Sequence, residues 1–408
     1  MKCRFCKNVL TKKFVDLANS PPSNSFLTRE QLNKPETFYP LTLYVCEKCW
    51  LVQIDEYKRF DEIFNQNYVY FSSCSQSWLE HARNYVEMIV NKLGLDRSSK
   101  IIEIASNDGY LLQYFKQKNI PCLGIEPTKN TADAAREKGI QVISEFFGEK
   151  LANKLAKQDI KADLLIGNNV LAHVPDINDF VRGLKIALRP GGTVTMEFPH
   201  LMRLVEQNQF DTIYHEHFSY FSFHAVETIF ASAGLEIFDV EELSTHGGSL
   251  RIYAKHSTDN SQEVSPNIDN LRQEECRRGM LNIQYYESFQ QKVDEVKNSF
   301  LSFLLKQKRE GRKVAAYGAA AKGNTLLNYC GVKKDLIPFV VDISVHKQGK
   351  FLPGSHIPVV KEQQISEFKP DFVLILPWNI KSEISTKLSY IRKWGGRFVV
   401  PIPEVRMF

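Results

Sequence analysis

The order of apolar and polar stretches divides the chain into three blocks. Residues 1 to about 65 hold short strand-like segments such as TLYVC, and residues from about 70 to about 255 alternate apolar runs with helical stretches. The apolar runs of this second block are KIIEIAS, CLGIEP, IQVIS, ADLLIGNNV and GGTVTMEFP. Short apolar strands that alternate with helices are typical of βαβ units around a parallel sheet.

A second pattern of this kind follows a connecting segment. The polar stretch STDNSQEVSPNIDN, residues 257–270, predicts a loop. It leads to a helix whose apolar residues recur at steps of three or four and therefore share one face: Phe289, Val293, Val296, Phe300 and Leu304. After it come the segments VAAYGAAAKG, IPFVVDIS, DFVLILP and GGRFVVPIP, which again join apolar strands to loops.

These patterns predict an α/β protein with more than one domain. A chain of 408 residues is too long for one ordinary core. We expect a small N-terminal domain at residues 1–68, a Rossmann-like domain at 69–258, and the connecting helix with a second Rossmann-like domain at 259–408.

Charge and hydropathy narrow the classes of function. The chain has 52 basic and 47 acidic residues, a net charge of +5, and its basic residues are scattered, so nucleic acid is not an expected partner. No apolar run approaches the ~18 residues of a membrane span. The start, MKCRFCKNVLTKKF, lacks the apolar core of a signal peptide. We therefore expect a cytoplasmic protein without a membrane partner. A monomer is the expectation, with an oligomer left open.

Four of the eight cysteines form two close pairs near the N-terminus. CRFC holds Cys3 and Cys6, and CEKC holds Cys46 and Cys49. Each pair presents two thiolates from one tight turn, and two such turns make the tetrahedral sulfur shell that zinc prefers. A shell of four sulfurs leaves no open coordination position. The sequence therefore predicts a structural zinc ion rather than a catalytic one.

The stretch IIEIASNDGYLL predicts a strand, a tight turn and a helix, with Asn107 or Asp108 as the helix cap. Glu103 ends this strand and Glu126 ends the next, where a carboxylate can accept ribose hydroxyls. The motif G-x-G-x-x-G is absent, and an acidic loop repels phosphate, so S-adenosylmethionine (SAM) is the predicted cofactor. The residues predicted to line its site are Glu103, Ala105, Asn107, Gly109, Glu126, Pro127, Phe147, Asn168 and Asn169. For Phe147, covering the adenine and packing in the core remain equal alternatives.

Taken in order, the motifs point to one family. They are the two cysteine pairs, EIASNDGYLL, GIEP, NNVLAHVPD, EFPHL, YHEHFSYFS, HGGSLR and YGAAAKGNTLLN. The chain resembles, over essentially its whole length, the sugar C-methyltransferases that act on nucleotide-linked 4-keto-6-deoxy sugars. It differs mildly at Ala105, where the family more often has glycine. The resemblance implies a zinc-binding N-terminal domain, a central class I SAM methyltransferase domain and a C-terminal Rossmann-like domain, with the substrate between them.

The resemblance also implies the site residues. The ketone of such a sugar acidifies the neighbouring carbon, C3, and a neutral histidine can remove its proton to give an enolate that takes the methyl group. His217 becomes the general base, with Tyr214 and Glu216 as neighbours and His173 as a donor to the ketone oxygen. Tyr68 is expected near the sugar or the methyl group, with Tyr70 as its competitor.

Four further residues are expected to bind the nucleotide sugar. His246 and Gly247 lie in HGGSLR, and Lys322 and Asn324 lie in the glycine turn of YGAAAKGN, which suits a diphosphate. Close packing of a helix on its strand explains the latter turn equally well. His215 is expected to be structural, because no further ligand set supports a metal site with His217.

Two other classes of function stay open from the sequence. One is an N- or O-methyltransferase that acts on RNA or another small molecule and uses the zinc domain to bind it. RNA would require clustered basic residues, which the chain lacks. The other is a catalytically silent binding protein, which would have no use for YHEH.

Overall fold

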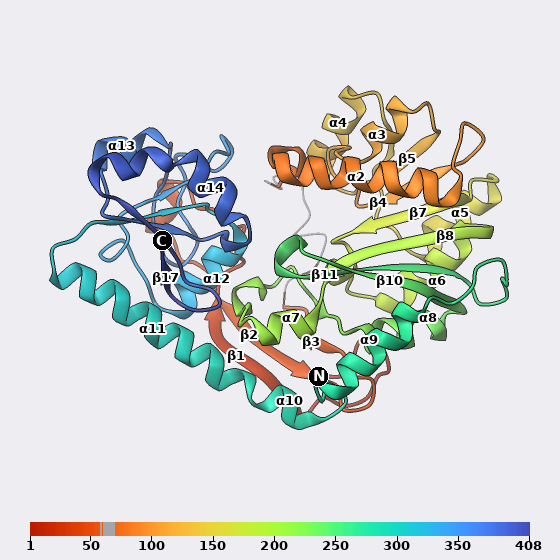
Figure 1. Cartoon of the computed structure of the whole chain (residues 1–408), viewed down its shortest axis with the longest axis horizontal. Coiled ribbons are helices and arrows are strands. Elements are labelled where there is room, and N and C mark those ends of the chain that lie inside the picture. Colours follow the sequence, from red (N-terminus) through yellow and green to blue (C-terminus); the bar gives the residue numbers. More distant parts are fainter. Residues whose placement is uncertain (58, 60–69) are drawn as a thin grey trace.

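The computed structural model describes residues 1–57, 59 and 70–408. Tyr68 and the expected domain boundary beside it lie outside the described residues. Three sheets organise the chain, of four, seven and six strands. Figure 1 shows the central and C-terminal sheets in two separate lobes, with the first strands of the N-terminal sheet below and between them.

The N-terminal sheet is antiparallel and takes its last strand from far along the chain. Its order is β1 (Lys12–Ser20), β2 (Tyr39–Val45), β3 (Val52–Ile54) and β9 (Ser219–Tyr220). A short 3₁₀ helix, η1 (Glu30–Asn33), lies between β1 and β2. β9 pairs with β3 through Val52 opposite Tyr220 and Gln53 opposite Ser219. The N-terminal sheet is therefore complete only when the central part of the chain joins it.

The central sheet has the mixed order β10-β11-β8-β7-β4-β5-β6. Its strands are β4 (Ile101–Ile104), β5 (Cys122–Ile125), β6 (Gln141–Ile143), β7 (Ala162–Asn168), β8 (Leu188–Pro199), β10 (Leu235–Leu243) and β11 (Ser249–His256). Strands β4 to β8 run parallel to one another, and β11 is antiparallel to both of its neighbours, β8 and β10. The strand order reverses between β4 and β7, and ligands of open α/β sheets bind beyond the carboxyl ends of the strands at such a point.

Helices cover both faces of this sheet. They are α2 (Gln76–Leu93), α3 (Leu112–Gln117), α4 (Lys129–Glu137), α5 (Glu149–Lys157), α6 (Ile177–Ala187) and α8 (Phe223–Ser232). Alternate strand residues enter different cores: Ile101 packs with α2 and α3, and Ile102 packs with α5 and α6. Burial on both faces explains why these strands are continuous apolar runs in the sequence.

Shorter helices connect the strands near the site. They are η2 (Ser72–Cys74), η3 (Leu171–His173), α7 (Leu201–Glu206), η4 (Phe210–Thr212) and η5 (Thr245–Gly247). The predicted cap of the helix after β4 is wrong, because α3 begins at Leu112 after Leu111. The side chain of Asn107 instead accepts a hydrogen bond from the backbone N–H of Ser72 at 2.9 Å.

The C-terminal part begins with three helices, α9 (Pro266–Arg277), α10 (Ile283–Glu287) and α11 (Phe289–Arg309). The loop predicted for residues 257–270 is therefore wrong from Pro266 onward. Ser265 accepts a hydrogen bond from Asn267 N and caps α9, whose first residue is proline. The predicted apolar face of α11 is confirmed: its five residues are at most 5% exposed.

A six-stranded sheet completes the fold, in the order β14-β13-β12-β15-β16-β17. Its strands are β12 (Val314–Tyr317), β13 (Val340–Val341), β14 (Val359–Val360), β15 (Phe372–Ile375), β16 (Arg397–Val400) and β17 (Arg406–Met407). Its helices are α12 (Ala321–Tyr329), α13 (Gln363–Phe368), α14 (Lys381–Lys387), η6 (Trp378–Ile380) and η7 (Ser389–Trp394). All strands but β17 are parallel.

One apolar core joins the N-terminal sheet to the C-terminal domain. Phe14 of β1 stacks on Phe289 of α11, with ring centroids 4.8 Å apart. Phe210, Ile213 and Phe218, which flank the histidine-rich stretch, belong to the same core. Among the helices of the described residues, we find none long and apolar enough to cross a membrane.

Candidate active site

The four paired cysteines meet at one point. Their sulfur atoms all lie within 4.8 Å of one another, with Cys3 and Cys49 at 3.6 Å and Cys6 and Cys46 at 3.5 Å. Zinc–sulfur bonds of ~2.3 Å in a tetrahedron place sulfurs ~3.8 Å apart, so the cluster fits a zinc ion. The donor set holds four thiols and no carboxylate or imidazole, which suits a structural ion.

The cysteine cluster is connected to the strand that follows the histidine-rich stretch. Gln53 of β3 donates to Cys3 Sγ at 3.3 Å and accepts from the backbone N–H of Arg4 at 2.7 Å. The Arg4 guanidinium donates to Pro175 O at 2.7 Å and lies 5.3 Å from the ring of Phe218. The first cysteine turn therefore packs directly against residues next to His217.

The turn after β4 has the backbone of a ligand-binding loop. Ala105 and Asn107 have φ values of 55° and 48°, and Gly109 has 74°. A Cβ on Gly109 would lie 2.4 Å from Cδ1 of Ile140, so only glycine fits there. Ala105 adopts a left-handed conformation that favours glycine.

Two buried carboxyl groups flank this turn. Glu103 is fully buried, and burial raises its pKa well above the usual range, although the hydroxyl of Tyr110 lowers it in part. Glu126 accepts backbone N–H groups of Asn107 and Thr128, each at 2.9 Å, and burial raises its pKa as well. Two buried carboxyl groups beside a turn with a ligand-binding backbone suit the amino group and the ribose hydroxyls of SAM, so the residues present fit this cofactor.

The end of β7 brings the cofactor residues to the predicted substrate loop. Asn168 donates to the hydroxyl of Tyr110 at 3.4 Å, and Asn169 Nδ2 donates to His246 Nε2 at 2.9 Å. The ring of Trp78 lies 5.0 Å from that of His246 and 5.9 Å from that of Tyr110. Burial lowers the pKa of His246 to about 4, so its imidazole is neutral near pH 7.

Phe147 and Pro127 lie at the margin of this group. The ring of Phe147 packs edge-on against Phe180, with centroids 5.4 Å apart, and is half-buried against the core of the central sheet. Pro127 is half-buried between Glu126 and the start of α4. For Phe147, core packing is thus the contact that the described residues make.

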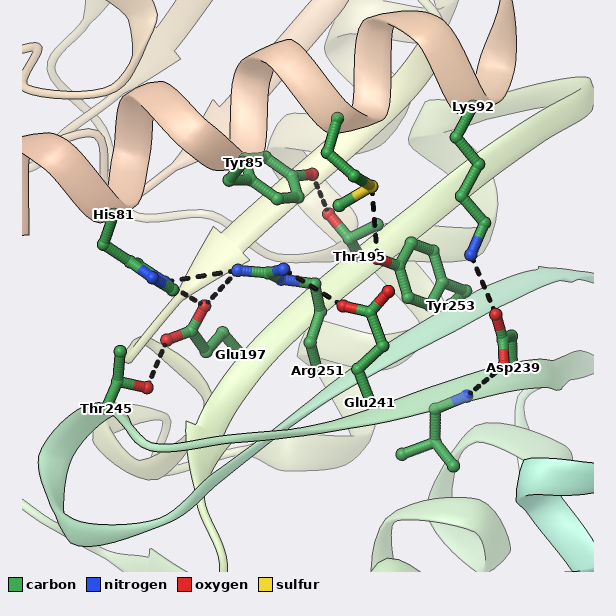
Figure 2. A network of polar contacts seen from close by, with 12 residues as sticks. His81, Tyr85, Lys92, Thr195, Glu197, Asp239, Glu241, Thr245, Arg251 and Tyr253 are labelled. Atoms are coloured by element: carbon green, nitrogen blue, oxygen red, sulfur yellow. Dashed lines mark hydrogen bonds and ion pairs between the residues drawn. The ribbon is translucent and has the colours of Figure 1, made fainter.

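A buried ion-pair network holds the loop that carries His246. Glu197 is fully buried and accepts hydrogen bonds from Arg251 and Thr245, each at 2.8 Å. His81 of α2 lies 2.8 Å from the same carboxylate (Figure 2). The hydrogen bonds and the Arg251 charge outweigh burial and keep the pKa of Glu197 at about 2. Because Thr245 begins η5, the network fixes the start of the predicted substrate loop.

The YHEH stretch is a turn rather than a strand, and it fixes the tautomer of His217. Its Nδ1 lies 3.0 Å from the carbonyl of Thr212, so Nδ1 carries the proton. Its Nε2 lies 2.9 Å from the Tyr214 hydroxyl, which donates to it. Burial, followed by the nearby imidazole of His173, lowers the pKa of His217 well below its usual 6.5. At neutral pH this imidazole is uncharged, and Nε2 is its basic atom.

The neighbouring side chains are held just as firmly. His173 Nδ1 donates to the carbonyl of Glu216 at 2.8 Å, and burial lowers its pKa to about 4. The side chain of Glu216 accepts from Asn24 of the N-terminal domain at 2.7 Å. His215 points away from this group and donates to Pro40 O at 3.2 Å. The structure thus brings Tyr214, Glu216, His217 and His173 together and separates His215 from them.

The C-terminal domain reaches the same turn. Thr325 of α12 donates to the carbonyl of Ile213 at 2.8 Å. Lys322 Nζ donates to Asn379 Oδ1 at 2.7 Å, and burial lowers its pKa. Asn324 is 1% exposed, and its side chain has no hydrogen-bond partner within the described part of the chain. Lys322 and Asn324 therefore lie in the helix that contacts the turn of His217.

Several residues of this site were not singled out from the sequence. Trp78, Glu197, Asp211 and Trp378 each contact a predicted site residue or its turn. Asp211 stands two residues before IYHEH, but its partner, Trp378, follows 167 residues later, a pairing that no local pattern contains. Glu197 lies within the quoted motifs GGTVTMEFP and EFPHL, and Trp78 lies outside every quoted motif; both read as ordinary core residues.

Comparisons with known proteins agree with this layout. Family models match a zinc binding domain at residues 3–64, a methyltransferase domain at 78–240 and a C-methyltransferase C-terminal domain at 244–403. The chain is 34% identical to C-methyltransferase NovU of Streptomyces niveus over 406 residues, which cover 100% of this chain and 96% of the relative.

Solved structures match over a smaller part of the chain. Magnesium protoporphyrin IX methyltransferase from Synechocystis is 14% identical over 43% of this chain and 79% of its own, with a TM-score of 0.33. A SAM-dependent methyltransferase from Clostridium acetobutylicum is 11% identical over 44% of this chain and 92% of its own, with a TM-score of 0.35.

The match with the C-methyltransferase relative covers the whole chain, and family models match each of its three parts. The chain therefore belongs to the C-methyltransferase family, as a SAM-dependent enzyme with an N-terminal zinc-binding domain.

Proposed function

We propose that this enzyme methylates C3 of a nucleotide-linked 4-keto-6-deoxy sugar, with His217 as the general base. The observation that supports this most is the state of His217: a neutral imidazole, with Nδ1–H donated to a carbonyl and Nε2 available as a base. Methylation of carbon requires removal of a carbon-bound proton, and a ketone next to that carbon makes its removal possible near neutral pH.

The first step of the reaction uses only groups of this chain. Nε2 of His217 takes the proton from C3, and the electron pair of that bond moves to the C4 oxygen as an enolate. The hydroxyl of Tyr214 stays protonated, because burial raises its pKa well above 10. When the sugar C–H occupies Nε2, this hydroxyl can turn its proton to the enolate oxygen. Bound SAM supplies the electrophilic methyl group for the enolate carbon.

The other residues take supporting roles in this proposal. In its observed tautomer Nε2 of His173 is an acceptor, so donation to the ketone oxygen would require the charged form, which its pKa of about 4 disfavours. We therefore give the donor role to Tyr214 and propose that His173 orders the turn through the Glu216 carbonyl. Tyr68 remains proposed for the sugar or the methyl group, with Tyr70 as its competitor.

The cofactor and the nucleotide belong to different domains in this proposal. Glu103, Ala105, Asn107, Gly109, Glu126, Pro127, Phe147, Asn168 and Asn169 are proposed for SAM, and His246, Gly247, Lys322 and Asn324 for the nucleotide sugar. We propose that the amine of Lys322 binds the phosphate groups of the nucleotide, because it lies close to the turn of His217. We propose the domain division at residues 68 and 258 that the sequence pattern suggests.

The test is deuterium exchange and methyl transfer with a panel of nucleotide-linked 4-keto-6-deoxy sugars. In heavy water the enzyme should exchange one sugar hydrogen without SAM, and with SAM the sugar should gain 14 daltons. His217→Asn should abolish both and retain SAM binding. Transfer to a sugar whose ketone has been reduced would indicate O-methylation and contradict the proposal. So would full exchange by His217→Asn.

A further inference from the structure

The turn that carries His217 is held by a side-chain contact with the C-terminal domain. The indole N–H of Trp378, in η6, donates to Asp211 Oδ2 at 2.7 Å. Asp211 is fully buried and Trp378 is 8% exposed. A hydrogen bond between the indole N–H and a buried carboxyl group is costly to lose, because water does not replace the lost donor there.

Asp211 is one peptide away from the group that fixes the base. Both Asp211 and Thr212 belong to η4, and the Thr212 carbonyl accepts Nδ1–H of His217 at 3.0 Å. Adjacent Cα atoms are a fixed ~3.8 Å apart, so a displacement of Asp211 moves this carbonyl and the imidazole bonded to it. The backbone of η4 therefore links the Trp378 contact to His217.

Trp378 itself has little freedom to move. A Cβ on Gly247 would lie 2.4 Å from Cη2 of the indole, so the loop of the predicted substrate residues packs directly on the ring. Lys322 Nζ lies 4.6 Å from the ring centroid on a cation–π contact. Gln209, two residues before Asp211, donates to the carbonyl of Gly247 at 2.7 Å. The indole is thus enclosed by the substrate loop, α12 and η4.

We propose that Trp378 is a positioning residue for His217. Its N–H holds Asp211 and, through η4, the Thr212 carbonyl that keeps the proton of His217 on Nδ1 and leaves Nε2 basic. The base of the central domain thereby depends on a side chain of the C-terminal domain. This inference rests on the proposed function for the role of His217 as base, but the contact and the tautomer can be tested separately.

Three variants isolate the hydrogen bond. Trp378→Phe removes the N–H and keeps an aromatic ring, and Asp211→Asn keeps an acceptor oxygen for the indole and removes the charge. Trp394→Phe is the matched control, because Trp394 also donates its N–H, to Pro370 O at 3.0 Å, within the same domain and far from the turn in sequence. Asp211→Ala breaks the contact from the other side if Trp378→Phe fails to fold.

The first readout is ¹⁵N NMR of the full chain labelled at histidine, with His217 assigned from the spectrum of His217→Asn. Trp378→Phe and Asp211→Ala should shift or exchange-broaden the Nδ1 signal of His217, while Asp211→Asn and Trp394→Phe leave it in place. An unchanged His217 signal in Trp378→Phe or Asp211→Ala overturns the proposal. This readout needs no substrate, so it decides the positioning role even if the proposed sugar is wrong.

The second readout is the rate of sugar hydrogen exchange. Trp378→Phe should lower kcat by about tenfold and change KM by less than about twofold, because a misplaced base slows the chemical step and leaves binding intact. Asp211→Asn should stay within about threefold of the parent enzyme. A rise in KM with unchanged kcat would overturn the proposal, because it would assign Trp378 to substrate binding. If the parent enzyme exchanges no hydrogen of any keto sugar, the proposed function is wrong. The NMR result still decides whether Trp378 positions His217.

Discussion

Burial sets the protonation of the histidines around the YHEH turn. His173 and His246 have pKa values of about 4, and the pKa of His217 lies well below 6.5, with desolvation as the largest cause in each. All three are therefore neutral at the pH where a histidine in water is half protonated. A base that is already neutral needs no second group to deprotonate it before it acts.

The pH dependence of sugar hydrogen exchange follows from this. The rate should stay level from about pH 8 down to about pH 6.5 and fall only at lower pH, because the folded pKa of His217 is depressed. Initial rates of deuterium incorporation between about pH 5 and pH 8 measure it. A midpoint at about pH 6.5 or above would show that His217 is not desolvated as the structure has it.

Folding stability provides the control for this measurement. In the unfolded chain the histidines take up protons near pH 6.5, whereas His173 and His246 in the folded chain resist protonation until about pH 4. The unfolded state binds more protons in this window, so the free energy of unfolding must fall as the pH drops from about 6.5 to 4. Exchange rates are therefore compared only where circular dichroism shows the folded chain.

At the scale of elements, the pattern of apolar residues predicted strands and buried helix faces, but not where each helix begins. The five parallel strands of the central sheet, β4 to β8, and the buried face of α11 followed from runs and spacings of apolar residues, whereas β10 and β11 were not predicted. The start of α9 was missed because a polar stretch was read as a loop, although Ser265 before Pro266 is a helix-start signal. The cap assigned to Asn107 or Asp108 was wrong because α3 begins only at Leu112. The side chain of Asn107 instead accepts a hydrogen bond from Ser72, a tertiary contact that no local pattern contains.

The residues of the candidate site also divide into those that a local motif reveals and those that only the fold reveals. Cys3 and Glu103 stand in motifs with their own spacing, so the sequence named them, whereas His217 was named through the family resemblance that its motif carries. Asp211 and Trp378 are an ordinary acidic and an ordinary aromatic residue until the fold brings them to 2.7 Å. Residues whose role depends on a distant partner cannot be found from one sequence.

The turn after β4 gives a prediction for an element of the cofactor site. Ala105 has φ 55°, a conformation that costs a residue with a Cβ roughly 1–2 kcal/mol and costs glycine nothing. Ala105→Gly should raise the free energy of unfolding by about 0.5 kcal/mol, the strain relieved less the added freedom of the unfolded chain. Denaturant titration of the full chain measures this change.

The matched control is Ala134→Gly in α4, where the helical backbone gives glycine no advantage. It should lower the free energy of unfolding by about 1 kcal/mol. Equal destabilisation by both substitutions would show that the turn after β4 does not hold the left-handed conformation at Ala105.

At the scale of the whole molecule, all three domains contribute a side chain to the turn of His217. The N-terminal domain contributes Asn24, the central domain His173 and the C-terminal domain Thr325, each through a hydrogen bond of 2.7–2.8 Å. The zinc cluster is joined to the same turn through Gln53 and β9. A zinc ion held by this cluster would stabilise the sheet that supports the turn of His217.

Removal of zinc should reach the turn of His217. Chelation, or Cys3→Ser, should lower the melting temperature by roughly 5 °C or more, because metal binding is coupled to folding of its domain. Hydrogen–deuterium exchange should also rise at the amides of Ser219 and Tyr220, which belong to β9. Cys276→Ser is the control, since Cys276 is exposed and lies outside the cluster. Unchanged melting and exchange after verified loss of zinc would contradict this coupling.

The position of β9 has a consequence for how the chain is made. A ribosome releases β3 long before β9, so the edge of β3 that β9 later covers stays open while most of the central domain is being synthesised. An open strand edge can pair with the wrong segment or with another nascent chain. The N-terminal sheet can therefore be completed only after the residues of the active-site turn have left the exit tunnel. The turn and the sheet that supports it must form together.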